Sequence, residues 1–191
     1  MKKIIFLLTF LISCTSSPQI KKDETLFKIQ LKDLQGNEIS FSTLVQSKLT
    51  VVIFLSPQCP ICQGYSITLK NLWQEFAKRD VHFTGIIPGA DFTKADIENY
   101  HQSYKISFEL LIDKQKELTH YLHATVTPQC FVIDSNGKIL YSGKIDDYAV
   151  APGVTKQQVT QHYLSDALTS ILENKKVAII KTEAAGCFIE R

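Results

Sequence analysis

Two patterns of apolar residues alternate along most of this chain and predict strands and helices in turn. Continuous apolar runs indicate core strands at 49–55 and 81–87, with a shorter strand at 108–112. Apolar residues three to four positions apart predict helices at 60–78, 93–104, 114–123 and 156–174. Turn residues predict hairpins at 27–41 and 130–142. This order predicts an α/β fold with a mixed central sheet flanked by helices and an N-terminal β-hairpin extension.

The first 13 residues have the composition of an export signal. Lys2 and Lys3 precede a short apolar run that ends at Ser13 and Cys14. The run is shorter than the roughly 20 residues that a membrane-spanning helix needs. Its end resembles the lipobox of bacterial lipoproteins, and this resemblance implies that Cys14 is acylated and becomes the first mature residue. An ordinary signal peptide or an uncleaved anchor is the alternative interpretation.

The rest of the chain divides into three parts. Residues 14–24 are polar and predict a lipidated tether, residues 25–175 form the domain, and residues 176–191 form a C-terminal tail whose composition suggests docking on the domain. We expect the protein in the bacterial cell envelope, lipid-anchored and facing the periplasm or the outer surface. Removing Lys2 and Lys3 from the 21 basic residues leaves 19, which equals the 19 acidic residues. Because no long basic run remains, nucleic acid is not an expected partner.

The most specific chemical motif is Cys59-Pro60-Ile61-Cys62, which follows a predicted buried strand and begins a predicted helix. Two cysteines at this spacing can close a small disulfide ring. The helix N-terminus would stabilise a thiolate on Cys59 through its dipole and free N–H groups. Cys59 is then the exposed nucleophile and Cys62 the more buried resolving thiol.

Two other interpretations of the motif are a structural disulfide and half of a zinc site. A zinc site needs a second pair of ligands, and the chain offers no second Cys-x-x-Cys. His120 and His123 are spaced three apart on a predicted helix, where we expect surface residues. We therefore predict a redox pair, with no metal and no cofactor.

These segments resemble the thioredoxin superfamily, and in detail its exported TlpA-like and redoxin-domain (AhpC/TSA-type) members. The likeness spans about 27–172 and is carried by the first hairpin, by Val51 to Cys62, and by Thr125 to Gly143 with Thr127-Pro128 at its start. It implies that Pro128 is cis and faces the cysteine pair, and that the Thr127 backbone binds an incoming substrate strand. Two positions depart from thioredoxins, where Gln58 replaces a tryptophan and Ile53 a buried acid. Water or a lysine such as Lys70 could take the Cys62 proton instead.

Cys130 and Cys187 allow several interpretations. Cys130, two residues after Pro128, could be a small buried apolar residue, a disulfide partner that holds the Cys187 tail, or an auxiliary redox thiol. Asp146 and Asp147 are expected in a solvated turn, with guidance of a substrate as the alternative.

The resemblance implies a thiol–disulfide oxidoreductase that acts on protein thiols and disulfides with a membrane electron donor upstream. By this resemblance we favour a reductant, and Pro60 and Ile61, which add no charge that would stabilise the Cys59 thiolate, argue against a strong oxidant. A peroxiredoxin-type peroxidase is the first alternative, with Ser56 suitably placed but Val52 where those enzymes have proline. A Sco-type copper protein is the second, although those proteins space their cysteines by three residues.

Overall fold

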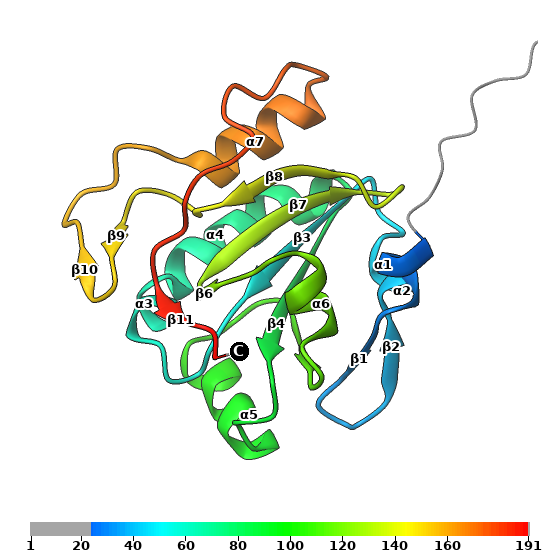
Figure 1. Cartoon of the computed structure of the whole chain (residues 1–191). Coiled ribbons are helices and arrows are strands. Elements are labelled where there is room, and N and C mark those ends of the chain that lie inside the picture. The colour runs from blue at the N-terminus through cyan, green and yellow to red at the C-terminus, as the bar shows by residue number, and fades with distance from the viewer. Residues whose placement is uncertain (1–23, 191) are drawn as a thin grey trace, which may run out of the picture.

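A computed structural model describes residues 24–190, so the predictions about the signal peptide, Cys14 and nearly all of the tether fall outside the described residues. Figure 1 shows strands and helices in alternation, followed by a hairpin, a helix and an extended tail. The helices are α1 (Glu24–Lys28), α2 (Phe41–Leu44), α3 (Pro60–Gly64), α4 (Ser66–Phe76), the 3-10 turn η1 (Ala77–Arg79), α5 (Lys94–Ser103), α6 (Glu117–Tyr121) and α7 (Tyr163–Leu172). The strands are β1 (Gln30–Lys32), β2 (Glu38–Ser40), β3 (Leu49–Phe54), β4 (Val81–Pro88), β5 (Glu109–Asp113), β6 (Val126–Thr127), β7 (Gln129–Asp134), β8 (Ile139–Gly143), β9 (Ala149–Ala151), β10 (Val154–Thr155) and β11 (Cys187–Phe188).

Seven strands form the central sheet in the order β2-β1-β5-β4-β3-β7-β8. β3 runs parallel to β4 and antiparallel to β7, so the sheet is mixed, as the sequence predicts. The β1–β2 hairpin joins the sheet through β5 and forms one edge. Within residues 24–190, no helix is long and apolar enough to cross a bilayer.

All six residues of β3 are buried because helices cover both faces of the sheet. Val51 and Ile53 belong to a core shared with α3, α4, α5 and α7, whereas Val52 and Phe54 belong to a second core shared with α1, α2 and α6. Alternate strand residues point to opposite faces, which explains the division. Burying each such side chain stabilises the fold by about 1.5–3 kcal/mol. This rigid central strand determines where the chain emerges at Leu55.

Two predicted elements begin or break at other residues than expected. Residues 24–28 form a helix, and the first strand of the N-terminal hairpin begins only at Gln30. The helix expected over 60–78 is interrupted at Tyr65, which ends α3 and precedes α4. Leu26 packs into the second core, so burial of this residue favours a helical turn over the alternating pattern of the sequence.

The predicted helix over 156–174 is too long. Only Tyr163–Leu172 is helical, and residues before it form the β9–β10 hairpin and a loop. That loop binds Asp147 through Lys156, Thr160 and Gln161. The backbone N–H groups of Thr160 and Gln161 donate to Asp147, which holds this segment as a loop ahead of α7.

Candidate active site

Cys59 and Cys62 lie where the chain turns from β3 into α3. Cys59 has extended backbone angles (φ −81°, ψ 113°) and caps α3, with Pro60 in the first turn. The Cys59 N–H donates to the Ser56 carbonyl at 3.1 Å, and the Cys59 carbonyl accepts from the Gln63 N–H at 3.1 Å. Proline suits this position because it has no N–H to leave unpaired. A thiolate at such a helix start is stabilised by the N–H groups of the first turn.

Cys62 lies one turn further on and is fully buried. Burial raises the pKa of the Cys62 thiol to about 12, although hydrogen bonds involving Ser56 and Thr127 act in the opposite direction. At neutral pH the thiol is therefore protonated. This matches the chemistry of a thiol that resolves a disulfide on a neighbouring cysteine and reacts only once it loses its proton.

The antiparallel pairing of β3 with β7 brings a second loop to the same place. Phe54 is opposite Gln129 in the register, so the end of β3 lies beside the residues that precede β7. The Thr127–Pro128 peptide bond is cis, as the resemblance implies. The Thr127 carbonyl oxygen lies 3.2 Å from the Sγ of Cys59. Two segments 68 positions apart thus meet at one sulfur atom.

The disulfide in this structure joins Cys59 to Cys187 rather than to Cys62, with Cα atoms 6.0 Å apart. The C-terminal tail returns across the sheet, and its strand β11 pairs with β6 (Figure 1). In this pairing Cys187 is opposite Thr127, and the Ile189 N–H donates to the Thr125 carbonyl at 3.0 Å. The tail covers Cys59 so well that only 2% of this residue is exposed. The expected exposure of the nucleophile is therefore wrong for this state.

Cys130 is a free, buried thiol, so the alternative of a Cys130–Cys187 disulfide is wrong. Cys130 is opposite Ile53 in the sheet and points into the first core. Its thiol donates to the carbonyls of Gly143 at 3.3 Å and Lys144 at 3.4 Å. Burial raises its pKa well above the ordinary range, and the charge of Asp146 adds to this. The other interpretation, a small buried apolar residue, agrees with these surroundings.

A cavity of about 320 Å³ opens beside the disulfide. The loop after β3, the loop before α5, the residue before α6, β6 and the tail form its lining, which includes Ser56, Gln58, Phe92, Lys116, Thr127 and Phe188. Phe188 is 78% exposed although it follows the disulfide-bonded Cys187 directly. The cavity therefore provides room for atoms of a second polypeptide next to Cys187.

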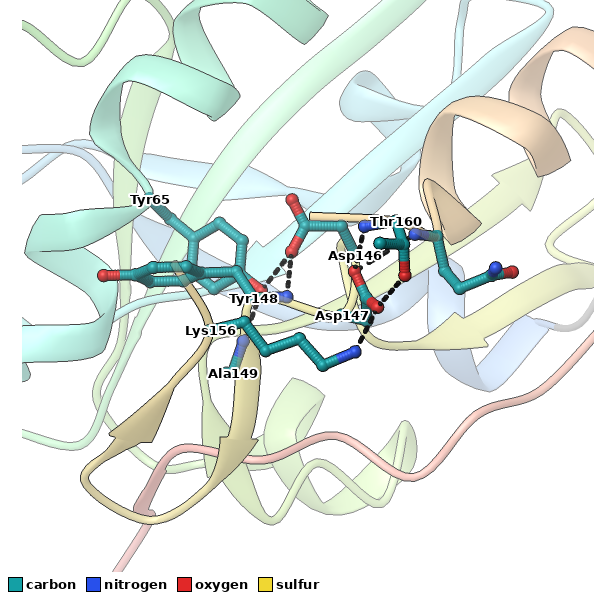
Figure 2. A network of polar contacts seen from close by, with 8 residues as sticks. Tyr65, Asp146, Asp147, Tyr148, Ala149, Lys156 and Thr160 are labelled. Atoms are coloured by element: carbon teal, nitrogen blue, oxygen red, sulfur yellow. Dashed lines mark hydrogen bonds and ion pairs between the residues drawn. The ribbon is translucent and has the colours of Figure 1, made fainter. Parts of the chain in front are cut away.

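The two acidic residues after β8 are buried, so the prediction of a solvated turn is wrong. Figure 2 shows their network, in which the Tyr65 hydroxyl donates to Asp146 at 2.6 Å. Asp147 accepts hydrogen bonds from the Lys156 ammonium at 2.5 Å and the Thr160 hydroxyl at 2.7 Å. The Lys156 bond, followed by those from Thr160, holds the pKa of Asp147 well below its usual range. Asp147 is thus ionised and serves as an anchor for the loop before α7.

The Tyr65–Asp146 bond connects this loop to the cysteine helix. Tyr65 is the residue at which α3 ends, three positions after Cys62. Burial, and then the hydrogen bond to Asp146, raise the pKa of Tyr65, so its hydroxyl stays a donor. The ring of Tyr148 packs edge-on against Tyr65, and a Cβ at Gly64 would lie 2.9 Å from the Tyr148 hydroxyl. A side chain at position 64 would therefore displace the Tyr148 hydroxyl from the end of α3.

The remaining candidate residues from the sequence contribute less to the candidate active site. His120 and His123 are exposed, and among residues 24–190 no three His, Cys, Asp or Glu side chains form a group that could hold a metal ion. Ile53 is buried where thioredoxins place an acid.

Sequence reasoning missed Tyr100 of α5, whose buried hydroxyl has no hydrogen-bond partner among the described residues. Burial, and then the charge of a Cys62 thiolate, raise its pKa. Nothing in the local sequence distinguishes this tyrosine from an ordinary core residue.

Comparison with known proteins agrees with this geometry. The chain is 25% identical over 132 residues to the thiol–disulfide oxidoreductase ResA of Geobacillus thermodenitrificans, covering 69% of this chain and 70% of the relative. An uncharacterized conserved protein of Geobacillus kaustophilus has a similar structure, with a TM-score of 0.76, 20% identity, and coverage of 91% of this chain and 94% of that one. A secreted disulfide oxidoreductase of Mycobacterium tuberculosis is similar over 78% of this chain and 98% of its own, with a TM-score of 0.57 and 21% identity.

These structural neighbours show that the fold is thioredoxin-like, with its mixed sheet between two layers of helices. Residues 23–142 match the AhpC/TSA family, a range that contains Cys59, Cys62, Thr127 and Pro128 and ends before the tail. The chain therefore belongs to the AhpC/TSA family.

Proposed function

We propose that this protein is a thiol–disulfide oxidoreductase that exchanges disulfides with other proteins through Cys59 and Cys62. One juxtaposition carries the proposal: Cys59 caps α3 with its sulfur 3.2 Å from the Thr127 carbonyl, and the buried Cys62 follows one turn later. The similarity to ResA, which is named for this reaction, supports it.

The reaction proceeds in two exchanges. The Cys59 thiolate attacks a substrate disulfide, so that a bond from Cys59 to one substrate sulfur forms and the other sulfur leaves as a thiolate. Cys62 then loses its proton and attacks Cys59, which releases the second substrate thiolate and closes the Cys59–Cys62 disulfide. Two electrons pass from the enzyme to the substrate. Thr127 binds the substrate backbone as a neighbouring strand during both steps.

We favour electron flow toward the substrate. Pro60 and Ile61 add no positive charge near Cys59, and a less stabilised thiolate makes the dithiol form a better reductant. A reductant must itself be reduced again, so the proposal includes a membrane electron donor upstream. Substrates are then protein disulfides of the bacterial cell envelope.

The envelope location rests on the N-terminal sequence. Cys14 follows an export signal and would hold the protein to a membrane by a lipid, with residues 15–24 as a tether. One structural relative is described as secreted, which supports an extracytoplasmic place for this fold. In that compartment disulfides form and persist, so a dithiol enzyme has substrates there.

A peroxidase fits less well. Val52 is a buried residue in the middle of β3 at the position where peroxidases of this fold have proline. A copper carrier of the Sco type also fits less well, because Cys59 and Cys62 are one residue closer together in the sequence than in those proteins.

The proposal is tested by the reduction of insulin disulfides with dithiothreitol as electron donor. Wild-type protein should accelerate precipitation of the insulin B chain, and Cys59→Ala should lose the acceleration. Cys130→Ala is the matched control, because it removes a buried thiol that lies outside the motif. Equal activity of wild type and Cys59→Ala would contradict the proposal.

A further inference from the structure

The tail strand occupies the place that the proposed mechanism gives to a substrate. β11 pairs antiparallel with β6, so that Cys187 is opposite Thr127 and Phe188 opposite Val126. The Cys187 sulfur is bonded to Cys59, as the substrate sulfur is in a mixed disulfide. A strand of this chain and a strand of another protein cannot bind Thr127 in this way at the same time.

The fit around Gly186 shows that the docking is specific. A Cβ on Gly186 would lie 2.1 Å from the Thr127 carbonyl oxygen and 2.7 Å from its carbonyl carbon. Both atoms belong to the backbone, so neither can move aside as a side chain can. Only glycine can therefore precede the cysteine in this register. The pair Gly186-Cys187 meets a steric requirement that an unstructured tail would not have to meet.

The tail is anchored shortly before this strand. Thr182 is bound to β8 by its N–H, which donates to the Ser142 carbonyl at 2.9 Å, and by its hydroxyl, which accepts from the Lys144 N–H at 2.8 Å. The Tyr141 hydroxyl lies 2.8 Å from the same oxygen. Only four residues thus separate this fixed point from Cys187. A tether this short maintains a high effective concentration of the Cys187 sulfur at Cys59.

We propose that Cys187 is a third redox cysteine, carried by a strand of the same chain that occupies the substrate position. Cys187 and Cys62 alternate as the disulfide partner of Cys59. In the exchange the Cys62 thiol loses its proton and its sulfur attacks Cys59. The Cys59–Cys187 bond breaks, the Cys59–Cys62 bond forms, and Cys187 leaves as a thiolate that takes up a proton. No electrons are gained or lost, so no further reactant is needed.

The inference rests on the proposed function and extends it in two ways. The oxidised enzyme protects Cys59 from small thiols, because the sulfur is covered by the tail. A protein substrate must replace the tail, and the register then favours extended segments in which glycine precedes the reacting cysteine. The family match ends at residue 142, so the strand that carries Cys187 belongs to a part of the chain that the match does not include.

The first test maps disulfides in the full mature chain carrying Cys62→Ser, oxidised by glutathione disulfide, quenched in acid and analysed by peptide mass spectrometry. The main product should be the Cys59–Cys187 disulfide. Adding Gly186→Val should lower its yield about tenfold and leave glutathione on Cys59, because the strand no longer reaches its register. Adding Phe188→Ala is the matched control and should retain the disulfide, since that ring is 78% exposed.

The second test follows the oxidised wild-type chain at pH 8, with thiols blocked by N-ethylmaleimide after different times. Isomers with Cys59–Cys62 and with Cys59–Cys187 should interconvert. Absence of Cys59–Cys187 in Cys62→Ser, or a Cys59–Cys187 bond in the wild type that never transfers to Cys62, would overturn the inference. Insulin reduction by the wild-type chain separates the two proposals: normal reduction without a Cys59–Cys187 disulfide in Cys62→Ser would overturn this inference alone, and absence of reduction would count against the proposed function.

Discussion

Cys59 and Cys187 are joined by a disulfide across 128 positions of sequence, and Thr127 lies against both residues. The proposed nucleophile of the Cys-x-x-Cys motif is therefore bonded to the tail while Cys62 remains a free buried thiol. This arrangement has the form of a mixed disulfide in which the substrate is part of the same chain. It also means that experiments on the motif must take the tail into account.

Substrate trapping should depend on both internal thiols. The double variant Cys62→Ser/Cys187→Ala should accumulate mixed disulfides between Cys59 and envelope proteins, because neither thiol can displace the bound substrate. Cys59→Ser/Cys187→Ala should trap none. Non-reducing gels and mass spectrometry measure the adducts. If both variants trapped equal amounts, the assigned order of attack would be wrong.

The collapse of a mixed disulfide on Cys59 should accelerate with pH. Burial raises the pKa of Cys62 to about 12, so only about one thiol in 10⁵ is ionised at pH 7. The groups that face it are uncharged at this pH: the Thr127 side chain, the Ser56 backbone and the Tyr100 hydroxyl. The rate of release of thionitrobenzoate from Cys59 in Cys187→Ala should therefore rise about tenfold per pH unit from 7 to 10. A rate that becomes constant above pH 9 would show that the pKa of Cys62 is that of an ordinary thiol, and would contradict this prediction.

The Asp147 anchor should make stability depend on acid pH. Its pKa in the folded protein is below the unfolded value, chiefly because of the Lys156 hydrogen bond. Stability from the anchor is therefore present at neutral pH and is lost as the pH falls below about 4. Asp147→Asn should lower the melting temperature at pH 7, and the difference from wild type should shrink at pH 3. Glu75→Gln, at an exposed position on α4, is the control and should change little.

Membrane attachment should depend on Cys14. Cys14→Ser should remove the lipid and release the protein from the membrane fraction, because the acylated sulfur is the proposed anchor. Labelling with a fatty-acid analogue and fractionation of cells measure both effects. A variant that stays labelled and sediments as before would show that the anchor is elsewhere.

Most of the central fold follows from patterns that the sequence contains locally. The apolar run at 49–55 predicts a strand buried on both faces, and β3 is such a strand. Pro60 after Cys59 predicts a helix start, and α3 begins there. The turn at Asn136-Gly137 predicts the β7–β8 hairpin. In each case the signal is a periodicity or a turn preference that neighbouring residues are sufficient to specify.

The features that the sequence did not predict depend on distant residues. Asp146 and Asp147 have the composition of a solvated turn, but Tyr65, Lys156 and Thr160 bind them in the interior. The sequence alone does not pair Cys187 with Cys59, because Cys59, Cys62 and Cys130 are all possible partners. The one local signal was Gly186, whose lack of a side chain permits the approach to Thr127.

The central claim is that Cys59 and Cys62 form a redox couple, and a redox titration of Cys187→Ala tests it most directly. The protein is equilibrated in glutathione buffers of graded potential, its thiols are modified with a large maleimide, and the disulfides are identified by mass spectrometry. We expect one two-electron transition, in which the ratio of Cys59–Cys62 disulfide to dithiol changes tenfold per about 30 mV. Absence of the Cys59–Cys62 disulfide at every potential, in a protein that remains folded, would contradict the account.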